Sequence, residues 1–117
     1  MTVETDIAAV LAAVCPRVTA DFADVGTARP YVTFQQVGGM ALNYIDTTAP
    51  DLKHGEYQIN VWADSRLDAT STARAIEAAM RAATAFTARP LGDLVADFDA
   101  DMKRHGTRQD FSVFSTR

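Results

Sequence analysis

Residues 55–80, GEYQINVWADSRLDATSTARAIEAAM, contain one strand, one turn and one helix, and the rest of the chain is arranged around them. From Tyr57 to Ala63 apolar residues alternate with polar ones, which is the period-two pattern of a half-buried strand. Trp62 falls on the polar side of this pattern. A large aromatic there indicates that the second face is covered too, by a loop or by another chain.

A helix is predicted to begin at Ser65. The Ser65 hydroxyl is placed to accept a backbone N–H, and the acidic Asp68 is favoured by the helix dipole. The small residues that follow predict a helix that packs closely on a sheet. They recur at spacings of four and three and form one narrow apolar stripe, made of Ala69, Ala73, Ile76, Met80 and Ala83.

The composition is that of one ordinary globular domain, residues 1–117. Of the 117 residues, 48% are hydrophobic and 22% are charged, and this length supports a single core. No window approaches the roughly 20 apolar residues that span a bilayer. The N-terminus lacks a basic region followed by an apolar run. We therefore expect no membrane segment, no secretory signal and a location in the cytoplasm of the cell that makes the protein.

The single cysteine and the net charge argue against two kinds of site. Cys15 alone cannot form an intramolecular disulfide or a cysteine-cluster zinc site, and it is predicted to be a small buried residue at a helix end. The formal net charge of −4 argues against general affinity for nucleic acid, because such binding depends on lysines and arginines that displace counterions.

The segment before residue 31 is predicted to hold one helix and one connection. Residues 5–14 form the helix, which Thr5 caps and the Cys15-Pro16 pair ends. Residues 17–30 indicate a surface connection. The apolar face of the helix contains Ile7, Val10, Leu11 and Val14.

Two strands and a loop are predicted before the central strand. Residues 31–37 are rich in β-branched and aromatic residues and form a strand confined between Pro30 and the Gly38-Gly39 pair. Residues 40–45 add a short strand that closes a hairpin through these glycines. Residues 46–55, DTTAPDLKHG, lack periodicity and predict a mobile loop.

The remainder of the chain predicts two more strands. Residues 87–93 indicate a connection, residues 94–102 a strand, residues 103–106 a turn and residues 109–116 the last strand. The predicted order is therefore α-β-β-β-α-β-β. This order favours an α+β domain with an antiparallel sheet of about four to five strands and both helices on one face.

Three carboxylates at period two, Asp97, Asp99 and Asp101, would project from one face of a strand. Such a row could bind a metal, but a calcium loop that begins at Asp97 fails, because its sixth position is Met102 and its twelfth is Arg108. The alternative interpretation is an acidic, solvated strand face.

No catalytic set is assembled in the sequence. His54 and His105 lie in turn-like segments without a second histidine at ligand spacing. Gly38-Gly39 is not followed by a helix start, as a phosphate-binding loop would be. The nucleophile-elbow, phosphate-loop and dinucleotide motifs are absent. We therefore expect no enzyme activity and no cofactor.

The linear arrangement resembles the small tail-completion, or tail-terminator, proteins of long-tailed bacteriophages and prophages. The resemblance covers most of the chain, and its signal is a PYV strand, a strand ending in VWA before a helix, and an alternating last strand. Three segments carry it: PYVTFQQVGG at 30–39, EYQINVWADSRLDATSTARAIEAAM at 56–80 and RQDFSVFSTR at 108–117.

The resemblance implies a structural protein of the virion tail. It implies a ring of identical copies, commonly a hexamer, that ends polymerisation of the tail tube and offers the surface on which the head docks. The implied partners are further copies of the chain, the tail tube protein and the head-tail connector protein.

Two groups of residues are candidate contacts within such an assembly. The acidic row Asp97, Asp99 and Asp101 is predicted to face the lumen, where carboxylates would repel passing DNA. The polar loop is predicted to reach a partner and contains Asp46, Thr47, Pro50, Asp51, Lys53 and His54.

Three alternatives remain open. A head-tail connector or neck protein of the same assembly would have the same sequence character. A small ligand-binding α+β domain would use a groove between the helices and the sheet. A metal-dependent nuclease would use the Pro50-Asp51 and Asp101-Met102-Lys103 elements, although a whole helix separates them here.

Overall fold

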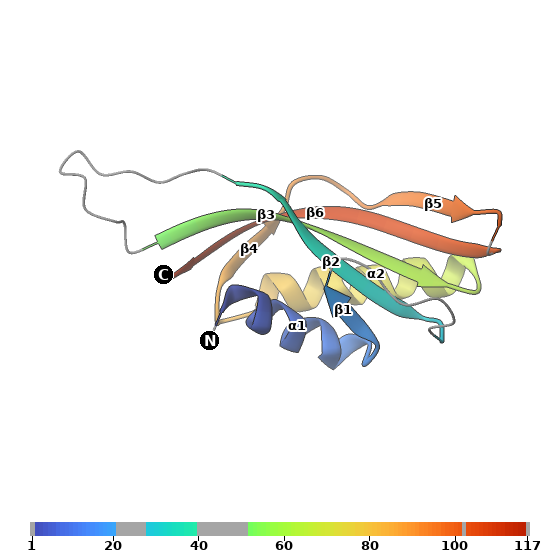
Figure 1. The fold of residues 1–117 in the computed structure, drawn as a ribbon, viewed down its shortest axis with the longest axis horizontal. Helices are drawn as coiled ribbons and strands as arrows, with labels where there is room; N and C mark the ends of the chain where they lie inside the picture. Colours follow the sequence, from blue (N-terminus) through green and yellow to red (C-terminus); the bar gives the residue numbers. More distant parts are fainter. Residues whose placement is uncertain (1, 21–27, 40–51, 102, 117) are drawn as a thin grey trace.

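The computed structural model describes residues 2–20, 28–39, 52–101 and 103–116. Two helices and six strands follow one another in the order α1, β1, β2, β3, α2, β4, β5, β6 (Figure 1). The helices are α1 (Val3–Val14) and α2 (Arg66–Ala82). The strands are β1 (Val18–Ala20), β2 (Tyr31–Gly38), β3 (Leu52–Ala63), β4 (Thr87–Pro90), β5 (Val95–Asp99) and β6 (Arg104–Thr116).

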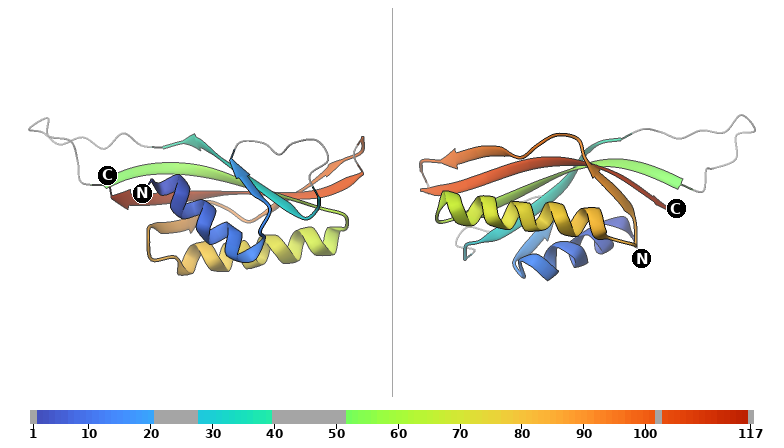
Figure 2. Two further views of the ribbon diagram at one scale, coloured as in Figure 1. Left: turned by 60° about the horizontal axis from the view of Figure 1, so that its bottom comes forward. Right: turned by 180° about the vertical axis from the view of Figure 1, so that it is seen from behind.

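All six strands form one open sheet with the order β1-β2-β3-β6-β4, and β5 also pairs with β6. The β1–β2 pair is parallel, and the other pairs are antiparallel. Both helices cover the same face of the sheet (Figure 2). The predicted α+β class and the placement of the helices are confirmed, and the sheet has six strands where four or five were expected.

The longest pairing joins β3 to β6, from Leu52 opposite Thr116 to Ala63 opposite His105. The predicted alternation is confirmed, because the alternate apolar residues Tyr57, Ile59, Val61, Phe111 and Val113 are buried in the core. The central strand is longer than predicted. Lys53 and His54 belong to β3 and not to a loop, because β6 supplies a partner strand for this polar segment.

Two short strands lie where connections were predicted. β1 falls in the segment 17–30 and pairs with β2, while β4 falls in the segment 87–93 and pairs with β6. They have only three and four residues, which is too short for a periodic pattern to show. The strand predicted for residues 40–45 lies outside the described residues. The turn predicted at Gly38-Gly39 is wrong for Gly38, which belongs to β2 and lies opposite Glu56 of β3.

The two helices supply the second layer of the core. The Ser65 hydroxyl accepts the backbone N–H of Asp68 at 3.1 Å, as predicted for the start of α2. The cap of α1 is Thr2 and not Thr5, because the Thr5 N–H donates to the Thr2 hydroxyl at 3.2 Å. The two helices bury one stripe each, made of Val3, Ile7, Leu11, Ala69, Ala73, Ile76 and Met80.

Trp62 is covered by a side chain of its own chain. It lies opposite Gly106 of β6, and a Cβ added at Gly106 would lie 2.6 Å from the indole ring. The Arg104 guanidinium carbon stands 4.4 Å from the ring centroid, which is a cation–π distance. An arginine of the same chain therefore covers part of the second face, and cover by a loop or by another chain stays a prediction.

Tyr57 anchors α1 to the sheet from within the core. Its side chain is buried, and its hydroxyl donates to the Glu4 carboxylate at 3.1 Å. Burial, with the nearby Glu4 charge and hydrogen bond, raises the pKa of Tyr57 from its ordinary value of 10.0 to about 12. The phenol therefore stays protonated in the folded state, where it can donate this bond.

Gly106→Ala is expected to destabilise the fold by about 1–3 kcal/mol, because the added methyl group overlaps the Trp62 ring. Gly92→Ala is the matched control, since nothing lies within 4 Å of a Cβ there, and its effect should stay within about 0.5 kcal/mol. Urea unfolding can be followed by the emission of Trp62, the single tryptophan of the chain. Equal stabilities of the two variants would contradict the packing of Trp62 on Gly106.

Tyr57→Phe is expected to lower stability by about 1 kcal/mol at pH 7, because the bond to Glu4 is lost. The raised pKa makes the contribution of Tyr57 fully present below about pH 10 and lost as the pH rises towards about 12. Wild type should therefore lose more stability across this pH window than Tyr57→Phe. Glu4→Gln keeps an acceptor without the charge and should fall between them in urea unfolding at each pH. Parallel pH curves for wild type and Tyr57→Phe would refute the assignment.

Candidate functional site

The sheet face that no described helix covers is polar. Its central positions lie on β2, β3 and β6, and their side chains are half-buried or exposed. None of the described helices is long and apolar enough to cross a membrane. This open face and the two sheet edges are candidate surfaces for partners. The central polar residues are Gln35, Gln58, Asn60, Arg108 and Asp110.

The outer edge of β6 is shared by two short strands. β4 pairs with positions 111–114 of β6, and β5 pairs with positions 104–108. The connection between β4 and β5 is not paired with β6. It borders an open hollow of about 330 Å³ beside Asp110. One Asp110 carboxylate oxygen is buried there without a hydrogen-bond partner among the described residues. We call this side of the sheet, residues 87–99, the β4–β5 edge.

Large apolar side chains are exposed along the β4–β5 edge. Leu91, Val95 and Phe98 are 54%, 48% and 51% exposed. The Phe98 ring contacts the His105 ring in a tilted arrangement, with the ring centroids 4.9 Å apart. Within the described residues no strand pairs with the outer side of β5. The Phe98 backbone N–H donates to the Asp97 side chain at 2.9 Å. An edge strand that has no outer partner strand and carries exposed apolar side chains is a template for another chain.

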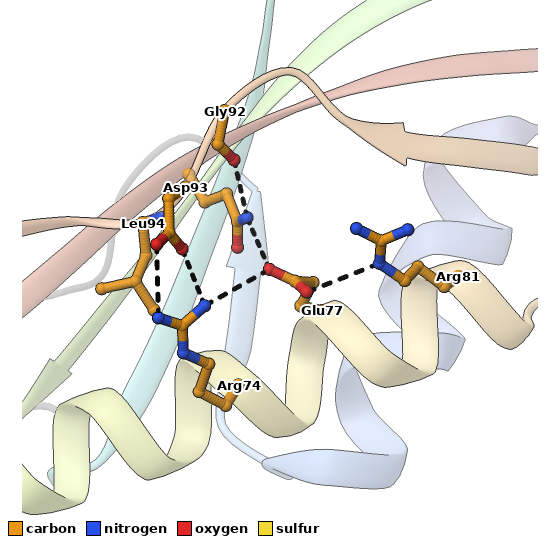
Figure 3. Close-up of polar contacts among 7 residues, drawn as sticks. Arg74, Glu77, Arg81, Gly92, Asp93 and Leu94 are labelled. Carbon is orange, nitrogen blue, oxygen red and sulfur yellow. Dashed lines mark hydrogen bonds and ion pairs between the residues drawn. The ribbon is translucent and has the colours of Figure 1, made fainter.

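A polar network holds the β4–β5 connection on α2 (Figure 3). Gln109 of β6 donates to Glu77 of α2 at 2.8 Å and to the Gly92 carbonyl at 3.0 Å. Glu77 also lies 3.7 Å from Arg74 and 3.4 Å from Arg81. Gln109 thus links strand, helix and connection at one point.

Arg74 ties the same connection to α2 through Asp93. The two side chains form an ion pair at 2.7 Å, and the backbone N–H of Leu94 also donates to Asp93 at 2.8 Å. The hydrogen bonds from Arg74 and Leu94 lower the pKa of Asp93 below its ordinary value. Asp93 therefore ties the β4–β5 connection to Arg74 of α2.

Arg66, in the first turn of α2, makes a second link to this edge that sequence patterns did not predict. Its guanidinium donates to the Gly106 carbonyl at 2.6 Å and to the Asp97 carbonyl at 2.5 Å. Backbone carbonyls carry no sequence signature, so only the fold could reveal these bonds. They hold β5 and β6 against the start of the helix.

The acidic row is not one row in the structure. Asp97 and Asp99 lie on β5, whereas Asp101 lies in the following turn. The predicted strand over residues 94–102 is wrong in this respect, because the chain turns back towards β6 after residue 99. Asp99 forms an ion pair with Arg104 at 2.9 Å, whereas Asp97 and Asp101 are exposed.

Arg104 gathers several residues at this end of the open face. Besides Asp99, its guanidinium donates to the Tyr31 hydroxyl and stacks on Trp62. Arginine, tryptophan and tyrosine dominate the residues that carry binding energy in protein interfaces. Sequence reasoning singled out Trp62 but not Arg104, which is 42 positions away along the chain.

The predicted contact loop is only partly within the described residues. Asp46, Thr47, Pro50 and Asp51 lie outside them. Lys53 and His54 lie on β3 and pair with β6 of the same chain. Contact between this segment and another protein therefore stays a prediction.

His54 and Ser112 form a pair that sequence spacing could not reveal. The His54 ring nitrogen Nε2 lies 2.7 Å from the Ser112 hydroxyl, and the ring contacts Phe114 in a tilted arrangement with centroids 4.5 Å apart. A serine beside a histidine can begin a nucleophilic site. Here the Ser112 side chain is only 8% exposed, which indicates a packing role in the sheet.

The metal-binding and ligand-binding interpretations find little support among the described residues. No three histidine, cysteine, aspartate or glutamate side chains among them lie close enough to hold a metal ion. Asp101 and Lys103 of the nuclease interpretation flank a turn, and Asp51 is not described. The hollow between α1 and the sheet has a volume of only about 50 Å³, which is small for the ligand groove of the binding-domain interpretation.

Comparison with known protein families gives one match. The family described as Tail completion protein gp17 matches residues 4–115. No curated protein matches the chain. The match spans both helices and all six strands, except for the ends of α1 and β6. The chain therefore belongs to the tail completion protein family, whose members are structural components of bacteriophage tails.

Proposed function

We propose that the chain forms a closed ring, commonly a hexamer in proteins that it resembles, at the head-proximal end of the tail tube. The ring ends polymerisation of the tube and offers the surface to which the head connector binds. The observation that carries this proposal is the family match over residues 4–115. The chain would act as one domain, through contacts instead of chemistry.

The architecture supports a role in assembly. The core lies between the helices and one sheet face, which leaves a polar face and two strand edges for neighbours. A ring of identical subunits needs two different, complementary patches on each copy. Opposite edges of one open sheet meet this requirement.

The end of the molecule where β3 begins and β6 ends is the proposed contact with the tail tube. The polar segment that precedes β3 contains Asp46, Thr47, Pro50 and Asp51, and Lys53 and His54 follow on the strand itself. Charged and polar groups of this kind suit the rim of a protein interface. The assignment to the tube stays a prediction.

The lumen-facing role of the acidic residues also stays a prediction. The charge of Asp99 is balanced by Arg104 at 2.9 Å. The negative field of such a lining would therefore come from the exposed Asp97 and Asp101. Repulsion between these carboxylates and phosphates would keep DNA from binding as it passes.

Light scattering coupled to size exclusion is expected to show a discrete oligomer of about six copies that persists across a tenfold range of protein concentration. At concentrations where the chain alone is dissociated, adding the tail tube protein of the same phage should increase the amount of this oligomer. Grids of the largest species should show closed rings, and a ring should cap one end of each assembled tube.

Two controls distinguish a tail-terminating ring from the alternative functions. Added before polymerisation, the chain should shorten the tubes in a dose-dependent way, whereas a neck protein would bind the head connector and leave tube length unchanged. A chain that stays monomeric in the presence of tubes, with no change in tube length, would refute the proposed function.

A further inference from the structure

We propose that neighbouring copies join through the two free edges of the sheet. The outer side of β5 in one copy pairs with the outer side of β1 in the next, so the sheet continues from copy to copy. This inference rests on the proposed ring, and it deepens that proposal by naming the two surfaces that meet.

The strand order places the two partners at opposite limits of the sheet. β1 ends the order on one side, while β4 and β5 line the other side, apart from β1 (Figure 1). Within the described residues neither β1 nor β5 has a strand on its outer side. Unpaired edges are the usual sites where one chain adds to the sheet of another.

The strand directions also fit. β1 runs parallel to β2, and the alternation of β2, β3, β6 and β5 makes β5 antiparallel to β1. Rotation about an axis along the strands does not reverse their direction. Adjacent copies in a ring would therefore present β1 and β5 to each other as an antiparallel pair, which forms well-spaced backbone hydrogen bonds.

The register follows from one row of residues that crosses the whole sheet. Its ends are Thr19 and Val95, which occupy the same face. We infer the register in which Thr19 of one copy lies opposite Val95 of the next, because this register also brings two opposite charges together. The row runs through Thr19, Thr33, Asn60, Arg108 and Val95.

The neighbouring row ends in opposite charges. Arg17 lies two residues before Thr19 and its carbonyl accepts from Val32 at 2.9 Å, so it extends the β1 ladder. Asp97 lies two residues after Val95 on the same strand. Both side chains are exposed. The same antiparallel register that brings Thr19 to Val95 brings Arg17 to Asp97, and directly opposed opposite charges stabilise a strand pair.

The charges and the exposed apolar side chains of the two edges together favour a second copy of the chain as the partner at each edge. The β1 edge carries the cation, the β5 edge carries the carboxylate, and the pairing would cover Val95 and Phe98. It would also place Asp97 in an ion pair at the joint between copies. With this pairing, the lumen-facing role proposed above for Asp97 and Asp101 would be carried by Asp101 alone.

A disulfide trap tests the pairing directly. Thr19→Cys and Val95→Cys are combined in a Cys15→Ser background, so that the introduced thiols are the only two. Directly opposite strand positions bring two cysteines within bonding distance. Mild oxidation should then give a ladder of covalent oligomers that ends at the size of the wild-type ring and collapses on reduction. Trp62 emission verifies that each variant is folded.

The matched control pairs Thr19→Cys with Ala78→Cys, an exposed position on α2. It carries the same number of thiols and should give no ladder. Suppose that the wild type forms rings but the Thr19–Val95 pair gives no ladder, or that both cysteine pairs give equal ladders. Either result would overturn the proposed edge pairing, while the proposal that the chain forms a ring would stand. A wild type that stays monomeric with tail tubes would overturn the ring itself and this inference with it.

Charge exchange gives a second measurement that does not depend on thiols. Arg17→Asp or Asp97→Arg alone opposes like charges and should raise the concentration for half-assembly about tenfold. The double exchange restores opposite charges and should recover most of the loss. Failure of the double variant to improve on either single variant would overturn the proposed register.

Discussion

The antiparallel ladder between β3 and β6 is the constraint on which the rest of the structure depends. It joins twelve consecutive positions, from Leu52 opposite Thr116 to Ala63 opposite His105. β2 pairs with β3, while β4 and β5 pair with β6. Because one face of the ladder is buried, a slip of one residue would turn Ile59 and Phe111 away from the helices. The register is therefore determined by the core.

Burial on one face leaves the other face and the edges available for assembly. α2 contributes to both results, because its apolar stripe packs on the sheet while Glu77, Arg74 and Arg66 hold the β4–β5 edge. The edge is thus attached to the core instead of being a loose flap. A rigid edge loses less conformational entropy when it meets a partner. This is the property that a protein acting through repeated contacts requires.

Local patterns predicted the parts whose packing is decided within a few residues. The cap at Ser65 and the stripe from Ala69 to Met80 were predicted correctly, because helix periodicity and capping are local. The shortest strands, β1 and β4, were missed, since three or four residues carry no reliable period. Lys53 and His54 were assigned to a loop, because their strand conformation depends on β6, more than 50 positions later.

The sequence by itself determined the α+β class, the central strand, both helices and the resemblance to tail completion proteins, because these follow from the order of local patterns. Tertiary structure alone decided which distant groups meet. It placed Arg104 on Trp62, separated Asp101 from Asp97, and brought Thr19 and Val95 to opposite ends of one row. Such contacts depend on strand order and register, and these are set by burial across the whole sheet.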